Sequence, residues 1–207
     1  MLWGVGRIAG VSAAETRERL LDAAARVFEL KGYDGATVSL IAQEAGVTTG
    51  AIYAHYASKA ELLAAALRAH GERATASLFP PGRRADAPTV LATLGARLAA
   101  RDPHESALLV EALLAARRDP ELADVLAVAL ADREALMAAL VGRAQQRGEL
   151  RADVSAAAAA RFSLMLGLGS ALSSSLGLGH GLPGVETSEW STLIQRVVDA
   201  FTTEEKL

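Results

Sequence analysis

The fold of this chain is decided by residues 37–63, which read TVSLIAQEAGVTTGAIYAHYASKAELL. Thr37 can cap a short helix that Gly46 ends, and Thr48 can cap a second short helix reaching His55 or Tyr56. The apolar side chains of this stretch can close a small core, namely Leu40, Ile41, Ala45, Val47 and Ile52. Two short helices joined by one glycine turn predict a helix-turn-helix.

Helix signals flank this stretch on both sides. Upstream, a capping box begins at Ser12, and apolar residues then recur at helical spacing, which predicts a helix over 12–31. Downstream, a second capping box begins at Ser58 and opens a helix that lasts until Pro80. The helix-turn-helix is therefore expected to sit within a module of at least three helices.

The remainder of the chain also carries helix starts. Asp102 and Asp119 are each followed by a proline, which combines an N-cap with a favourable first helical residue. Further helices are expected to begin at Asp153 and at Thr187 or Ser188. The sequence predicts an all-α protein of about nine helices and contains no convincing strand.

Composition excludes several classes of protein. The chain has 207 residues, 21 Lys+Arg, 24 Asp+Glu and a net charge of -3, which is neither a disordered nor a polybasic composition. It has no Cys, so disulfides, thiolate metal sites and thiol nucleophiles are absent. The uncharged run 162–179 is long, but half of its residues are Gly or Ser, which favours a buried or subunit-facing helix over a membrane span.

From Gly32 onward the chain reads G-Y-x-x-x-T-V-x-x-I-A-x-x-A-G-V-T-x-G-x-I-Y-x-H-Y-x-S-K-x-x-L-L. This pattern resembles the TetR family of bacterial repressors, and the resemblance extends over roughly residues 15–70. It implies a cytoplasmic, homodimeric transcription factor that binds a near-palindromic double-stranded DNA operator and is released by a small hydrophobic effector. No cofactor, metal, enzymatic activity or membrane is implied.

The resemblance also implies a division into domains. Residues 1–11 are expected to form a flexible leader, residues 12–57 the helix-turn-helix DNA-binding domain, and residues 58–207 a helical domain for effector binding and dimerisation. The identity of the effector, the operator sequence and the choice between repression and activation are left open.

Nine residues are candidates for contact with DNA by the same resemblance. Those at positions that meet phosphates or bases in the family are Thr37, Thr48, Tyr53, His55 and Lys59, and those where bases are read are Gln43, Thr49 and Ala51. Gly50, between the last two, offers a bare backbone. A lysine ammonium suits a phosphate, whereas the two capping threonines already have a structural role. Base reading is expected to be weak, because strong discrimination usually comes from Arg, Asn or a bidentate Gln.

Candidates for the other two sites lie in the later helices. An aliphatic effector pocket is expected to be lined by Leu113, Leu114, Met137, Phe162 and Met165. The dimer interface is expected within 153–178 and 187–203, with contacts from Phe162, Gly169, Trp190, Ile194 and Val197. The alternative is that these helices only close the core of a monomer.

Two other classes of function remain as alternatives. An enzyme is disfavoured because the glycine pattern at Gly4–Ala9 follows no strand, no nucleophile motif occurs, and the four histidines lack ligand spacing. A protein adaptor that has lost DNA binding is the second alternative. It stays open because residues 1–60 hold six Lys or Arg and six Asp or Glu, which gives a net charge of zero.

Overall fold

The computed structural model describes residues 13–76, 87–99, 103–176 and 185–202. Within these ranges the chain forms nine helices and, apart from a single bridge between Leu150 and Thr202, no β-structure. The helices are α1 (Ala13–Gly35), α2 (Val38–Ala45), α3 (Thr49–Tyr53), α4 (Lys59–Ala76), α5 (Ala87–Ala99), α6 (Pro103–Ala116), α7 (Pro120–Gln146), α8 (Ala156–Ser175) and α9 (Thr187–Phe201). The predicted all-α fold is confirmed, while the predicted leader and the break at Pro80 lie outside the described residues.

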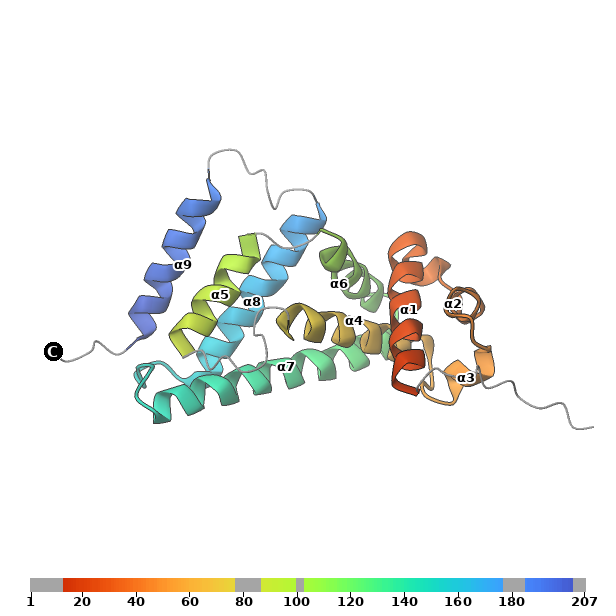
Figure 1. Cartoon of the computed structure of the whole chain (residues 1–207), viewed down its shortest axis with the longest axis horizontal. Coiled ribbons are helices and arrows are strands. Elements are labelled where there is room, and N and C mark those ends of the chain that lie inside the picture. The colour runs from red at the N-terminus through yellow and green to blue at the C-terminus, as the bar shows by residue number, and fades with distance from the viewer. Residues whose placement is uncertain (1–12, 77–86, 100–102, 177–184, 203–207) are drawn as a thin grey trace, which may run out of the picture.

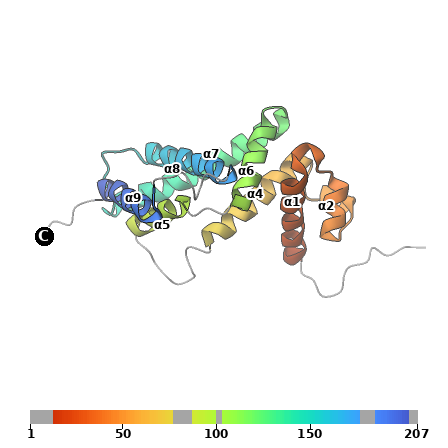
Figure 2. The same cartoon turned by 90° about the horizontal axis from the view of Figure 1, so that it is seen from above.

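The helices form two groups with three further helices between them. In Figures 1 and 2, α1, α2 and α3 gather at one end of the molecule, and α5, α8 and α9 lie at the opposite end. Helices α4, α6 and α7 lie between them, and α7 extends from one group to the other. The helix-turn-helix is therefore held at one extremity, away from the bulk of the later helices.

The two short helices of the helix-turn-helix are capped by the side chains that the sequence predicts. The hydroxyl oxygen of Thr37 accepts a hydrogen bond from the amide of Leu40 at 3.2 Å, and that of Thr48 accepts one from the amide of Ala51 at 3.1 Å. Gly46 ends α2 in the left-handed region with φ 68°. The second helix is shorter than expected, because α3 ends at Tyr53.

Two other helix starts differ from the prediction. Helix α8 is capped by Ser155, whose hydroxyl oxygen accepts from the amide of Ala158 at 3.1 Å, while the carboxylate of Asp153 is occupied by Arg151. Helix α9 is opened by a capping box at Glu186, one residue before the earliest expected start. In both cases a side chain within three residues of the expected cap accepts from the unpaired amides at the start of the helix instead.

One core connects the helix-turn-helix to the rest of the molecule. Its fully buried side chains come from α1 to α4 and also from α6 and α7, and the largest are Phe28, Ile41, Ile52, Leu62, Leu63, Leu108 and Leu122. The first half of α4 therefore packs with α1–α3 and not with the later helices alone. A domain boundary at residue 57 would cut through this core.

Helices α5 and α9 approach each other closely at Gly95. A Cβ atom at this buried position would lie 2.4 Å from Cγ2 of Ile194. The indole N–H of Trp190 donates to the carbonyl of Gly95 at 3.2 Å. A glycine at this point allows the two helices to pack backbone against side chain.

We expect Gly95→Ala to lower the free energy of unfolding by about 1–3 kcal/mol, because the added methyl overlaps Ile194 and forces α5 and α9 apart. Urea denaturation measures this change. Gly167→Ala is the matched control: a Cβ there meets nothing within 4 Å, so the better helix propensity of alanine should leave stability equal or raised. Equal effects of the two substitutions would contradict the close packing.

Candidate nucleic-acid interface

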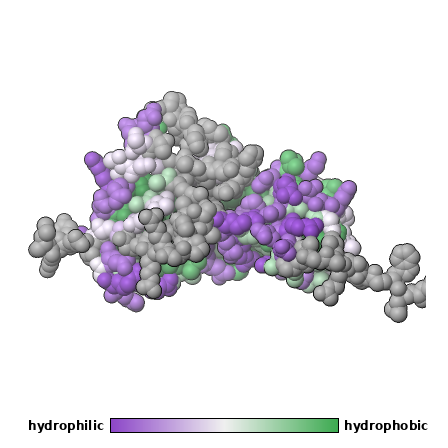
Figure 3. Space-filling view, viewed as in Figure 1, coloured by the Kyte–Doolittle hydropathy of each residue, from purple (hydrophilic) through white to green (hydrophobic). Residues whose placement is uncertain are grey.

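The exposed side of α2, the turn and α3 carries the predicted DNA-contacting residues. Tyr53 is 56% exposed, while Ile41 and Ile52 on the opposite side of the same helices are buried. The structure places eight of the nine predicted residues in exposed positions, namely Thr37, Gln43, Thr48, Thr49, Gly50, Ala51, Tyr53 and His55. Figure 3 shows that the part of the molecule formed by α1–α4 presents mainly hydrophilic residues, with a few hydrophobic ones between them.

The capping role of Thr37 and Thr48 is compatible with a second contact. In each residue the hydroxyl oxygen accepts a hydrogen bond from its own helix. A hydroxyl group also has one proton to donate, and both side chains are exposed. Each threonine can therefore cap its helix and donate to a phosphate oxygen at the same time.

Lys59, the ninth residue, has a different environment from the one that the sequence predicts. Its ammonium donates to the carbonyl of Tyr33 at 2.7 Å and to that of Ala36 at 3.3 Å, and lies 4.1 Å from the centre of the Tyr33 ring. Helix α1 ends here, so these carbonyls lack partners within the helix. Lys59 joins the start of α4 to the end of α1, and only part of its donor capacity remains for a phosphate.

Two arginines of the module also bind within the chain. The guanidinium of Arg19 donates to the carbonyl of Ala45 at 3.0 Å, at the end of α2. Arg26 forms an exposed ion pair with Glu44 at 3.2 Å. These contacts hold α2 against α1, and they reduce the positive charge that the module presents outward.

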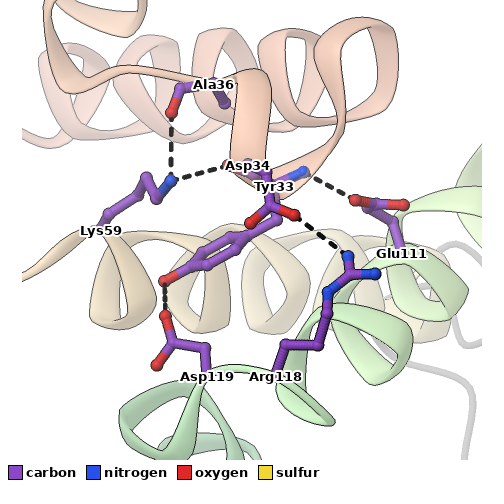
Figure 4. A network of polar contacts seen from close by, with 7 residues as sticks. All are labelled: Tyr33, Asp34, Ala36, Lys59, Glu111, Arg118 and Asp119. Atoms are coloured by element: carbon purple, nitrogen blue, oxygen red, sulfur yellow. Dashed lines mark hydrogen bonds and ion pairs between the residues drawn. The ribbon is translucent and has the colours of Figure 1, made fainter.

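Tyr33 is the centre of a polar network between the helix-turn-helix and the later helices (Figure 4). Its backbone amide donates to Oε1 of Glu111 in α6 at 2.7 Å, and its hydroxyl donates to Oδ2 of Asp119 at 2.9 Å. Its ring stacks on that of Phe28, with centroids 6.0 Å apart. The amide, carbonyl, ring and hydroxyl of this buried residue are all engaged.

Burial and hydrogen bonding shift the pKa values of Tyr33 and Asp119 in opposite directions. Burial, followed by the hydrogen bond to Asp119, raises the pKa of the Tyr33 hydroxyl well above its usual value. The amide of Leu122, followed by the Tyr33 hydroxyl, lowers the pKa of Asp119. At neutral pH Tyr33 is therefore a neutral donor and Asp119 a charged acceptor.

The backbone just before Tyr33 adopts a conformation that favours glycine. Gly32 has φ 67°, in the left-handed region, and interrupts the helical conformation of α1. A Cβ at Gly32 would lie 3.0 Å from Oε1 of Glu111. The sequence pattern contains the Gly-Tyr pair, but the roles of Glu111 and Asp119 depend on contacts that only the folded chain shows.

The predicted effector residues differ in their exposure. Leu114 and Met165 are 51% and 53% exposed, while Leu113 and Met137 are half-buried. A small cavity of about 80 Å³ lies elsewhere, between α5, α7, α8 and α9, and of the predicted residues only Phe162 lines it. Its other lining residues include Leu91, Val141, Leu150, Leu166, Ile194, Val198 and Phe201. The predicted set as a whole therefore stays a prediction, and Phe162 is the member that borders this cavity.

The predicted dimer residues also divide into two groups. Ile194 is 7% exposed and packs against α5, so it is a core residue and not a surface residue, while Trp190 and Val197 are half-buried. Gly169 and Phe162 lie on the exposed side of α8. They belong to an apolar stripe with alternating spacings of four and three residues, formed by Ala158, Phe162, Met165, Gly169, Leu172 and Leu176. We call this the α8 stripe.

The α8 stripe belongs to a helix of unusual composition. Helix α8 is long and apolar enough to cross a membrane by length and composition, with a mean hydropathy of 1.3, and 11% of it is buried inside the chain. Four large side chains of the stripe, Phe162, Met165, Leu172 and Leu176, are 49–64% exposed. The helix packs against α6 and α7, and an exposed apolar stripe of this size is typical of a contact surface.

Comparison with known proteins agrees with the geometry of the helix-turn-helix. A family model described as "Bacterial regulatory proteins, tetR family" matches residues 20–66. The chain is 46% identical over 63 residues to the HTH-type transcriptional regulator SrpR of Pseudomonas putida, a match that covers 30% of this chain and 30% of SrpR. A match to TtgW of the same species covers 47% of that relative, so these first relatives are matched over less than half of their length.

Longer matches extend into the later helices. The chain is 28% identical over 157 residues to the HTH-type transcriptional regulator UidR of Escherichia coli (strain K12), covering 76% of this chain and 80% of UidR. Among solved structures, a TetR-family regulator from Rhodococcus sp. has 23% identity and a TM-score of 0.76, covering 92% of this chain and 100% of that one. Salmonella enterica GusR has 24% identity and a TM-score of 0.69, covering 92% and 97%.

We expect Lys59→Met to lower the free energy of unfolding by about 1–3 kcal/mol, because the carbonyls of Tyr33 and Ala36 lose a charged donor while the aliphatic stem is kept. Thermal denaturation measures the change. Lys31→Met, at an exposed lysine of the same module, is the control and should change stability by less than about 0.5 kcal/mol. An unchanged stability of Lys59→Met would mean that this ammonium is free for DNA.

Proposed function

Because this chain belongs to the TetR family of bacterial helix-turn-helix transcriptional regulators, we propose that it is a cytoplasmic repressor that binds a near-palindromic operator as a homodimer. The observation that carries the proposal is the exposed face of α2 and α3, on which eight candidate contact residues surround two capped helix starts. Binding of a small hydrophobic effector causes the repressor to leave the operator.

Each side chain of this face suits a particular group of the DNA. The amide of Gln43 can pair with adenine in the major groove, and the methyl groups of Thr49 and Ala51 can contact a thymine methyl. The absence of a side chain at Gly50 allows close approach of the backbone. The hydroxyl of Tyr53 and a ring nitrogen of His55 can donate to phosphates on either side of the groove.

Because each module offers few base contacts, specific binding requires two half-sites. For base reading, a single copy of α3 offers one hydroxyl, two methyl groups and a bare backbone, which is a weak basis for discrimination. Two copies related by a twofold axis double the contacts and require half-sites about one helical turn apart. The near-zero charge of the module further limits its nonspecific affinity for DNA.

The α8 stripe supports pairing with a second copy of this chain. Its spacing follows the pattern by which two helices pack along a shared seam. Gly169 has nothing within 4 Å of a would-be Cβ, so the backbone of a partner helix can come close there. The outer face of α9 is more polar, with Glu189, Thr192 and Arg196 exposed, and therefore suits the rim of the interface.

The cavity between α5, α7, α8 and α9 supports an apolar effector. Its polar lining groups are satisfied within the chain: the amide of Gln145 donates to the carbonyls of Arg151 and Val154, and the hydroxyl of Ser163 donates to that of Ala159. A volume of about 80 Å³ suits a small apolar molecule or the apolar end of a larger one. To release DNA, that molecule must bind better to a geometry in which the two modules no longer match the operator.

We expect the purified chain to bind operator DNA, obtained by in vitro selection, with an affinity that falls steeply with salt. Gln43→Ala should weaken binding by about tenfold or more and relax the preference at one position of each half-site, and Tyr53→Phe should weaken binding to all sequences alike. Fluorescence anisotropy at two salt concentrations measures both effects.

The control for this experiment is Leu136→Ala, which changes an exposed apolar residue of α7 outside the helix-turn-helix. It should leave affinity unchanged. Failure of the folded wild-type chain to select any sequence at low salt would contradict the proposal and favour a protein adaptor.

We expect Leu172→Glu to convert the dimer to a monomer at micromolar protein, because it places a charge within the α8 stripe. Analytical ultracentrifugation measures the mass. Val128→Glu introduces the same charge at an exposed apolar residue of α7 and should leave the dimer intact. A dimer that survives Leu172→Glu, or a wild-type chain that is monomeric at this concentration, would exclude the stripe as the interface.

A further inference from the structure

The network around Tyr33 joins elements that are far apart in the sequence. The hydroxyl of Tyr33 reaches Asp119, 86 residues later, and its amide reaches Glu111, 78 residues later. The two carboxylate oxygens of Asp119 bind different helices. Oδ2 accepts from the hydroxyl of Tyr33 in α1, and Oδ1 accepts from the amide of Leu122, in the first turn of α7, at 3.1 Å. One carboxylate therefore caps α7 and holds the end of α1.

Helix α7 leads from this carboxylate toward the cavity. It has 27 residues, so it is roughly 40 Å long at 1.5 Å per residue. Val141 and Gln145, near its far end, line the cavity. One continuous helix therefore connects the cavity lining to Asp119, whose carboxylate binds Tyr33.

We propose that Tyr33 is the positioning residue of the DNA-binding module and that its hydrogen bond to Asp119 fixes the angle between the helix-turn-helix and α7. The inference rests on the proposed function and deepens it. In a dimer joined at α8, this angle sets the separation of the two recognition helices. Half-sites at a fixed spacing are bound well only when this separation is narrowly defined.

The other polar contacts of the junction are less suited to this role. Arg118 and Asp34 form an ion pair at 3.0 Å, but their side chains are 69% and 75% exposed, so solvent and salt screen the interaction. Lys59 connects α4 to α1 and involves no atom of α7. The Tyr33 hydroxyl is the group that donates to the capping residue of α7, and it does so from a side chain that is 4% exposed.

The contact can be removed with little other change. Tyr33→Phe deletes the hydroxyl and keeps the ring that stacks on Phe28 and lies under Lys59. Asp119→Asn keeps an oxygen that can cap α7, since Asn is as good an N-cap as Asp, and removes the negative charge that strengthens the bond to Tyr33. Asp34→Asn is the matched control, because it removes a carboxylate from the same junction at an exposed position.

The test compares the affinity of each variant for the full operator and for a single half-site, at a temperature at which circular dichroism shows every variant folded. Tyr33→Phe and Asp119→Asn should each lose on the order of tenfold in affinity for the full operator and less than about twofold for the half-site. The double variant should be no worse than either single variant, because both changes remove one contact. Asp34→Asn should change neither affinity by more than about twofold.

Three results would overturn the proposal. Equal losses on the full operator and the half-site would show that the contact only supports the module itself. Unchanged affinities would show that the angle is fixed elsewhere. Additive losses in the double variant would show that Tyr33 and Asp119 act separately.

A second measurement separates this proposal from the proposed function. The chain has no Cys, so spin labels at Thr49→Cys and Leu136→Cys, diluted with unlabelled chain, report the distance between α3 and α7 even if no DNA is bound. Tyr33→Phe should broaden or shift the distance distribution, whereas Asp34→Asn should not. An unchanged distribution overturns the positioning role, and a wild-type chain that binds no DNA overturns the function alone.

Discussion

The kink in α1 at Gly32 is the constraint on which the arrangement of the helix-turn-helix depends. Its positive φ of 67° ends the regular part of α1 and points the amide of Tyr33 toward Glu111. The phenol then reaches Asp119, and the carbonyls of the turn face Lys59. Any other residue at this position would be strained and would lie against Glu111, so one glycine allows α4, α6 and α7 all to bind the end of α1.

The module uses its positive charges mainly to hold itself together. Arg19 and Lys59 donate to backbone carbonyls at the ends of α2 and α1, and Arg26 pairs with Glu44. On the proposed function, DNA affinity must then come from neutral donors, from the dipole and amides of helix starts, and from the pairing of two modules. This makes the relative position of the modules more important than the charge of either one.

The two sides of α8 face different surroundings. One side, with Leu166 and Ser163, faces the cavity, and the exposed side carries the α8 stripe. Phe162 belongs to both, since it lines the cavity and is 52% exposed. On the proposed function, a molecule in the cavity therefore lies next to the seam between two copies and at the far end of the helix that begins at Asp119.

The sequence by itself determined the local structure: the all-α class, the glycine turn at Gly46, and the caps at Thr37, Thr48 and Asp119. These depend on groups within about four residues of one another, so pattern and spacing are sufficient. The tertiary structure alone decided that Lys59 binds the end of α1, that Ile194 is buried against Gly95, and that Tyr33 meets Asp119. Those contacts join residues that are 26, 99 and 86 positions apart. The type of a side chain does not reveal which of its many possible partners it will meet, because that depends on how the helices pack.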